Sequence, residues 1–93
     1  MREKTIEKKL VQAVKVMGGI APKFTSPGFD GMPDRLVLLP SGKIAFVEVK
    51  WHGKKPRPLQ AARHGLLRRR GIKVYVLDDG KKIGGILNEI QST

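Results

Sequence analysis

Two carboxylates in this chain stand where a charged side chain needs a partner. Asp34 opens the apolar run 35–39, and Glu48 lies near the end of the largely apolar run 43–50. Moving a carboxylate out of water into an apolar strand is strongly unfavourable unless a cation or hydrogen-bond donors compensate for it. Carboxylate oxygens are the ligands that Mg²⁺ and Mn²⁺ prefer in proteins. The two acids therefore predict a site for a hard divalent cation, with Lys50 directly beside it.

A hairpin would bring these acids together. Turn residues 40–42 predict antiparallel pairing, so that Asp34 lies near Glu48. Two adjacent carboxylates repel each other, and one of their pKa values rises unless a cation intervenes. The backbone carbonyl of Val49 is a natural third ligand, and Lys50 is placed to hold or activate an attacking water. For Glu48 and Lys50 alone, the ordinary alternative is an ion pair at a strand end, worth at most about 1 kcal/mol.

The elements that must position these residues follow from hydrophobic periodicity, which predicts an α/β fold with a small mixed β-sheet flanked by helices. The expected order is α-β-β-β-α-β-α. The helices are expected over residues 3–17, 58–70 and 81–90, and the strands over 20–25, 35–39, 43–50 and 73–77.

Three details of this arrangement can be tested. The strand over 20–25 should be an edge strand, because Pro22 lacks an N–H donor. The run 35–39 has no polar alternation, which predicts burial on both faces. Parallel pairing across the helix 58–70 is expected from the strand–helix–strand order. On that helix Leu59, Ala62 and Leu66 share one face.

The charge balance indicates a polyanionic partner. The 93 residues contain 19 Lys and Arg against 8 Asp and Glu, which gives a net charge of +11 at pH 7. A field of this sign favours nucleic acid, and the alternative is a basic surface that serves solubility alone. There is no cysteine, so disulfides and thiolate metal sites are excluded.

The length indicates a single domain over residues 1–93. A chain of this size buries only about 60–65% of its unfolded surface, so dimerisation would be a natural way to bury more. No apolar segment approaches the ~18 residues of a membrane span, and the N-terminus lacks the apolar core of a signal peptide. We therefore expect a cytoplasmic protein with no membrane partner.

The acidic pair lies in a pattern that resembles a known nuclease signature. Pro33-Asp34, followed after thirteen residues by Glu48-Val49-Lys50, resembles the PD-(D/E)XK motif. The longer set is similar to the VRR-NUC (virus-type replication–repair nuclease) family, and it comprises residues 31–35, 46–50 and Pro58-Leu59-Gln60. The resemblance covers nearly the whole chain and implies a restriction-endonuclease-like core. Stand-alone members of the family are small, often phage-encoded, and tend to act as homodimers on branched DNA.

The resemblance also implies roles for individual residues. Asp34 and Glu48 would be metal ligands, together with the Val49 carbonyl. Lys50 would be the catalytic lysine. Gln60, which opens the helix after the basic loop, would orient the metal-bound water or the scissile phosphate.

The family further uses a glutamate of the first helix as a catalytic residue and metal ligand, and this chain offers two candidates for it. Glu7 fits, because Leu10, Val11 and Val14 follow it at three, four and seven residues and place it beside the apolar stripe. Glu3 is the rival, one turn earlier and close to the terminus. For either residue the ordinary alternative is an acid that interacts favourably with the helix dipole.

Basic residues follow the motif directly and predict a DNA-binding surface. Lys54, Lys55 and Arg57 form a loop after Lys50, where they can contact flanking phosphates, and Arg63 would extend this surface. The alternative for the loop is an ordinary solvated surface.

Together these features predict a Mg²⁺-dependent endonuclease in which Mn²⁺ can substitute. It would act as a homodimer on branched DNA such as four-way (Holliday) junctions, in the host cytoplasm if the gene belongs to a phage. Two alternatives remain open from the sequence. One is a non-catalytic nucleic-acid-binding module, and the other is a small subunit of a nucleoprotein assembly.

Overall fold

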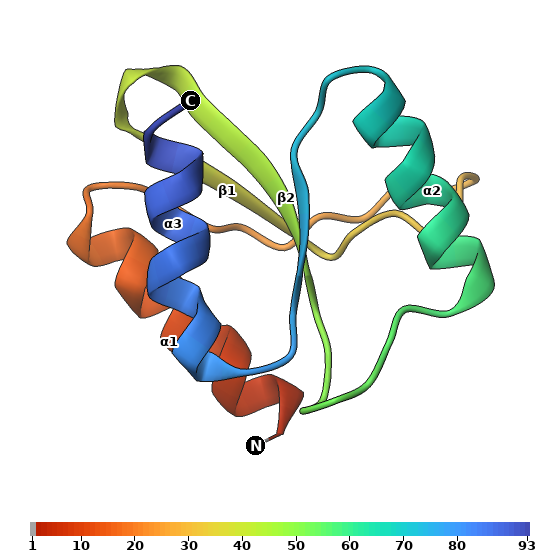
Figure 1. The fold of residues 1–93 in the computed structure, drawn as a ribbon, viewed down its shortest axis with the longest axis horizontal. Helices are drawn as coiled ribbons and strands as arrows, with labels where there is room; N and C mark the ends of the chain where they lie inside the picture. The colour runs from red at the N-terminus through yellow and green to blue at the C-terminus, as the bar shows by residue number, and fades with distance from the viewer. Residues whose placement is uncertain (1) are drawn as a thin grey trace.

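A three-stranded mixed sheet in the order β1-β2-β3 lies at the centre of the computed structural model, which describes residues 2–93. The elements are α1 (Glu3–Val16), β1 (Arg35–Leu39), β2 (Lys43–Val49), α2 (Pro58–Arg69), β3 (Val74–Leu77) and α3 (Ile83–Gln91). Short 3-10 turns at Pro40–Gly42 and Gly80–Lys82 precede β2 and α3. Helices α1 and α3 lie together on one side of the sheet and α2 lies on the other (Figure 1). The expected small mixed α/β fold is confirmed.

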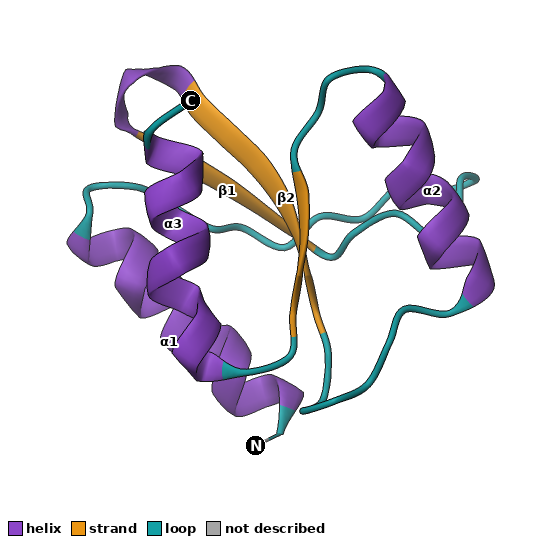
Figure 2. Ribbon diagram, viewed as in Figure 1, coloured by secondary structure: helices purple, strands orange, loops and turns teal. Residues whose placement is uncertain are grey.

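The pairing of the strands agrees with the sequence pattern. β1 and β2 form an antiparallel hairpin in which Arg35 pairs with Val47. The tight turn between them is possible because Ser41 and Gly42 both adopt positive φ, 68° and 72°. β2 and β3 pair in parallel, and α2 makes the crossover between them (Figure 2).

The hydrophobic core lies between the sheet and the α1–α3 pair. Ile6, Leu10 and Val14 of α1 have no exposed surface, and they pack with Val47 and Val49 of β2. Side chains alternate faces along a strand, so Glu48 between those two valines points to the opposite face, toward α2. One face of β2 therefore stabilises the fold, and the other is free to carry polar side chains.

The face of α2 that carries Leu59 and Ala62 is not its buried face. Leu59 is 47% exposed and Ala62 is also exposed, whereas the buried residues of α2 are Gln60 and His64. The helix faces the side of β2 that bears Glu48, and Gln60 donates a hydrogen bond to that carboxylate. A buried carboxylate requires a donor opposite it, and this sets the rotation of α2 against its apolar pattern.

The expected strand over residues 20–25 does not form as a regular strand. The segment runs beside β1 but makes only two isolated bridges, Ile20 with Leu38 and Lys23 with Arg35. Pro22 accepts a hydrogen bond from Leu36 through its carbonyl but has no N–H to return one, so the ladder is interrupted. The sheet therefore has one strand fewer than predicted.

Burial on both faces of β1 was also a wrong prediction. Val37 and Leu39 are buried against the core, while Leu36 and Leu38 on the other face are only half-buried. On that face the Phe24 ring, from the 20–25 segment, packs against Phe46, the β2 partner of Leu36. Within residues 2–93, no helix is long and apolar enough to cross a membrane.

Candidate active site

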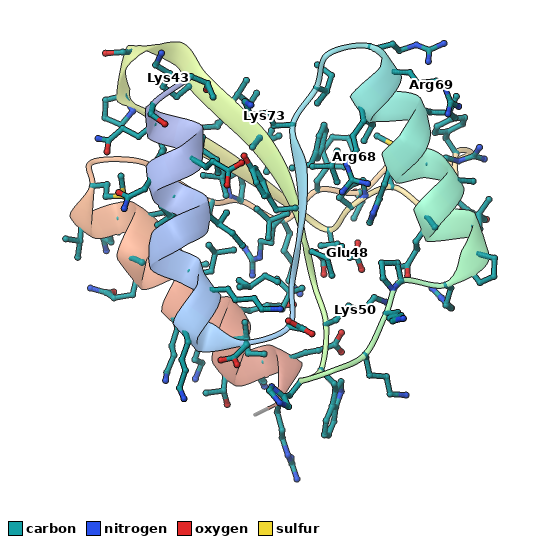
Figure 3. The ribbon with its side chains drawn as sticks, viewed as in Figure 1. Lys43, Glu48, Lys50, Arg68, Arg69 and Lys73 are labelled. Atoms are coloured by element: carbon teal, nitrogen blue, oxygen red, sulfur yellow. The ribbon has the colours of Figure 1, made fainter. Side chains whose placement is uncertain are left out.

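The predicted site residues meet where β2 ends, between the start of β1 and the first turn of α2. Figure 3 shows Glu48 and Lys50 on the side of β2 that faces α2. Continuing the β1–β2 register beyond Arg35 and Val47 by one residue places Asp34 opposite Glu48. The hairpin therefore brings the two acids together as the sequence pattern predicts.

Glu48 is a buried carboxylate with one oxygen satisfied and one not. Only 3% of the residue is exposed. Its Oε2 accepts a hydrogen bond from Gln60 Nε2 at 3.0 Å and lies 3.5 Å from Lys50 Nζ, while its Oε1 is buried and has no hydrogen-bond partner. Burial, and then repulsion from Asp34, raise the pKa of Glu48 to about 7. An unpartnered buried oxygen of this kind calls for a cation or a proton.

The side chain of Asp34 is hydrogen-bonded to the backbone at the end of β2. Its Oδ1 accepts a hydrogen bond from Val49 N at 3.1 Å. Burial raises the pKa of Asp34 above its usual range, and the nearby Glu7 raises it further, while the Val49 N–H opposes both. In an extended strand the N–H and the carbonyl of one residue point to the same edge, so the Val49 carbonyl is directed to the edge that carries Asp34.

Gln60 is fixed at both ends of its amide. Its Oε1 accepts a hydrogen bond from Arg57 N at 2.9 Å, which satisfies a free N–H at the start of α2. Since the oxygen is engaged there, the NH₂ group is directed to Glu48 Oε2. Pro58 begins the helix at a position where its missing N–H costs nothing. Gln60 therefore orients a carboxylate of the site, which is a contact that the sequence pattern did not specify.

Glu7 lies near Asp34, and it is held there by Arg35, a residue to which the sequence analysis assigned no role. Arg35 NH2 is 3.3 Å from Glu7 Oε2, and Arg35 NH1 donates to Ala21 O at 2.7 Å. Glu7 is near enough to raise the pKa of Asp34, whereas Glu3 is not among the groups that affect it. The sequence does contain a signal for Arg35, because this charged residue begins an otherwise apolar strand.

The donor set fits a hard divalent cation held by few protein ligands. Among residues 2–93, no three His, Cys, Asp or Glu side chains lie close enough to hold a metal together. The available ligands are Asp34, the free oxygen of Glu48 and the Val49 carbonyl, with Glu7 farther out. Mg²⁺ typically takes one or two carboxylates and keeps water and substrate oxygens in its remaining positions, so these residues fit it.

The predicted DNA-binding residues divide into two groups. Lys54, Lys55 and Arg57 are exposed on the loop that follows Lys50. Arg63, in contrast, is half-buried and already engaged by the loop of residues 26–32, because its Nε donates to Asp30 O at 2.7 Å and its guanidinium lies 3.9 Å from the centre of the Phe29 ring. Its role as a free phosphate contact is therefore weaker than the sequence suggested.

His64 is a buried polar residue that sequence reasoning missed. It lies one turn after Gln60, is 1% exposed, and its Nε2 has no hydrogen-bond partner. Burial lowers the pKa of His64, and the charges of Arg68 and Lys50 lower it further. A neutral imidazole beneath the site adds no positive charge to it.

Comparison with known proteins agrees with this arrangement. No family model matches the chain. The chain is 56% identical over 78 residues to "Putative nuclease p44" of Acyrthosiphon pisum secondary endosymbiont phage 1, a match that covers 84% of each protein. A solved structure described as "VRR_NUC domain" superposes with a TM-score of 0.87 at 33% sequence identity, over 95% of this chain and 97% of that one.

The fold, the site and these relatives together define a nuclease with a PD-(D/E)XK core, a class whose fold implies a divalent metal cofactor. The chain belongs to the VRR-NUC family, as a phage-type member. The resemblance drawn from the motif is therefore confirmed, and so is the prediction of a nuclease.

Proposed function

We propose that this nuclease is a Mg²⁺-dependent DNA endonuclease that acts on branched DNA, such as four-way junctions, as a homodimer, and that Mn²⁺ can replace Mg²⁺. The observation that carries the proposal is the unpartnered, buried Oε1 of Glu48 beside Asp34. Two adjacent carboxylates with raised pKa values at one end of the sheet do not favour stability, and a cation that binds between them would explain their presence.

The residues of the site have separable roles in this proposal. Asp34, Glu48 and the Val49 carbonyl hold the ion, which when bound neutralises charge on the phosphate and lowers the pKa of the attacking water. Lys50 donates hydrogen bonds from Nζ to that water or to a phosphate oxygen. Gln60 keeps Glu48 in one rotamer, because its own amide is anchored at Arg57 N. A supporting contact of this kind typically affects metal affinity or activity by about 10- to 100-fold.

Glu7 completes the acidic set in the proposal. The Arg35 guanidinium holds its carboxylate near Asp34, so Glu7 can accept a hydrogen bond from water around the ion without ligating it directly. Glu3 has no contact of this kind among the described residues, which favours Glu7.

Positive charge beside the site supports a nucleic-acid substrate. The loop that carries Lys54, Lys55 and Arg57 begins immediately after Lys50 and is exposed, so it is available for phosphates on one side of the cleaved bond. The homodimer is supported by the family likeness and by size, because one 10.3 kDa subunit is small for two arms of a junction. Sedimentation that finds a monomer at micromolar concentration, with and without DNA, would contradict the dimer.

A cleavage panel tests the proposal. Duplex, flap, splayed-arm and four-way DNA are incubated with the protein and Mg²⁺, Mn²⁺ or EDTA. We expect metal-dependent nicking that is fastest on branched substrates and is lost in Glu48→Ala and Glu48→Gln, both of which should fold. Cleavage by these variants at the wild-type rate would overturn the assigned site. Salt-sensitive binding without cleavage under any metal would favour a binding module instead.

A further inference from the structure

The loop of residues 26–32 packs against the first half of α2 and is hydrogen-bonded to it. Arg63 donates from Nε to the Asp30 carbonyl at 2.7 Å. Gly31 adopts φ 92°, and a Cβ at this position would lie 2.9 Å from Leu59 Cγ and 3.1 Å from Leu59 O. A hydrogen bond between Phe29 N and Ser26 O closes the loop on itself. These contacts fix the position of the loop relative to α2.

Phe29 is presented to solvent by this loop. Phe24 and Phe46 pack edge to face with ring centres 5.1 Å apart, but Phe29 is 44% exposed. The Arg63 guanidinium lies 3.9 Å from the Phe29 ring centre, which covers one face of the ring and restricts its rotation. The remaining surface of the ring is open, in a position that the Arg63 contact defines.

Asp30 and Gly31, which follow Phe29 in the loop, line a hollow that also reaches Gln60, the residue that contacts Glu48. This hollow, of about 500 Å³, is lined by Asp30, Gly31, Arg57, Pro58, Leu59 and Gln60. At its inner side Gln60 donates to Glu48. Leu59, at 47% exposure, is a second exposed apolar side chain next to this loop, because it lies against Gly31. An apolar surface thus lies next to the place where a phosphate would be cleaved.

The charges around this apolar surface indicate what covers it. Arg57 lines the hollow, and Lys54 and Lys55 precede it on the exposed loop; Asp30 is the acidic residue among the lining groups. A ligand with an anionic backbone and a flat apolar face fits both features. A nucleotide has both, since every base has a π-face that stacks on aromatic side chains.

We propose that Phe29 and Leu59 form a platform for an unpaired nucleobase adjacent to the cleaved phosphate, with Arg63 holding the Phe29 ring in place. Bases within a continuous duplex are stacked on their neighbours and are not available to the platform, whereas the unpaired bases of bulges, flaps and splayed arms are. The platform therefore selects DNA with an unstacked base. This inference rests on the proposed function and assigns its preference for branched DNA to two side chains.

The test measures binding in the Glu48→Gln background, so that cleavage does not interfere. Three DNAs of equal length are compared by fluorescence anisotropy at fixed salt: a paired duplex, the duplex with one bulged base, and the same bulge with an abasic site. We expect tighter binding to the bulged base than to its abasic counterpart. Phe29→Ala should reduce that preference roughly 5- to 100-fold, the range of base–aromatic stacking, and leave duplex affinity unchanged. Phe29→Trp should retain the preference.

A matched control is Ile44→Ala, which removes another exposed apolar side chain, 50% exposed at the opposite end of β2, and should leave all three affinities unchanged. Thermal unfolding verifies that each variant folds. An unchanged bulge-to-abasic ratio in Phe29→Ala, or an equal loss on all three DNAs, would overturn the platform. Failure of the wild-type protein to cleave would overturn the proposed function separately, because the binding ratio does not depend on cleavage.

Discussion

At the scale of single residues, Glu48 is the central side chain of the proposed site. Its carboxylate is buried. One oxygen accepts a hydrogen bond from Gln60 and forms an ion pair with Lys50, and the other oxygen has no hydrogen-bond partner. Its carboxylate is harder to ionise than a free one because burial and Asp34 both oppose the charge. The same features that destabilise the charged form without metal favour a divalent cation when one is present, since the cation removes both penalties.

Removing this charge should stabilise the metal-free protein in a pH-dependent way. The pKa of Glu48 is about 7 in the folded protein against a usual value of 4.5, so the folded state disfavours the ionised form. Stability from this group is therefore present below pH ~4.5 and lost as the pH rises to ~7. In EDTA, Glu48→Gln should unfold with a free energy about 1–3 kcal/mol higher than wild type at pH 8, and with little difference at pH 4.5.

Urea denaturation of both proteins at the two pH values measures this difference. Gln keeps the side-chain shape and can still accept the Gln60 hydrogen bond, so the comparison isolates the charge. An equal difference between the proteins at pH 4.5 and pH 8 would show that Glu48 titrates normally in the folded state.

At the scale of elements, α2 and the loop of residues 26–32 act as one unit. The helix places Gln60 against Glu48, and the loop docks on the outer side of the same helix turn through Gly31 and Asp30. Helix and loop together form the wall of the hollow that leads to the carboxylates. Disturbing the loop should therefore disturb the site through α2.

Gly31 is the position where this unit tolerates least change. Its φ of 92° disfavours any L side chain, and an added Cβ would meet Leu59 and Arg63 at 2.9–3.1 Å. We expect Gly31→Ala to lower the free energy of unfolding by about 2–3 kcal/mol. Gly53→Ala is the matched control, because Gly53 also has a positive φ of 77° but nothing lies within 4 Å of its Cβ, and it should cost only about 1 kcal/mol.

Denaturant unfolding of the two variants tests the close approach of loop and helix. Equal destabilisation by both substitutions would mean that backbone strain alone matters at Gly31 and that the loop is not tightly docked.

At the scale of the whole molecule, an excess of positive charge surrounds a small acidic site. The net charge of +11 attracts DNA from a distance, while the few carboxylates at the sheet edge would recruit the metal. Figure 3 shows further cations, Arg68 and Lys73, on the segments around the end of α2. Because these charges are widely spread, much of the affinity for DNA should be electrostatic and sensitive to salt.

The salt dependence of binding separates phosphate contacts from the general field. Lys55→Ala should reduce the slope of log K against log salt concentration by about 0.9 on duplex DNA if its ammonium contacts one phosphate. Lys15→Ala removes the same charge from the last turn of α1 and should leave the slope unchanged. Equal changes in slope for the two variants would place the DNA elsewhere than beside the loop after Lys50.

The sequence by itself determined the part of the site that depends on local geometry. The turn at residues 40–42 sets the hairpin register, and strand alternation sets the face of each residue, so the meeting of Asp34 with Glu48 and Lys50 followed from spacing alone. The motif was sufficient to indicate the family for the same reason: its acidic residues and its lysine lie in a single hairpin.

Only the tertiary structure decided the contacts between distant elements. Three contacts join segments that are far apart in the sequence: Gln60 with Glu48, Arg35 with Glu7, and Arg63 with Phe29. The burial of His64 likewise depends on how α2 packs. The spacing of these residues in the sequence does not predict any of these features. The apolar spacing of α2 does not indicate its buried face, because providing a hydrogen bond to the buried Glu48 outweighs burying Leu59. The packing of α2 against the end of β2 thus determined how the two acids are held.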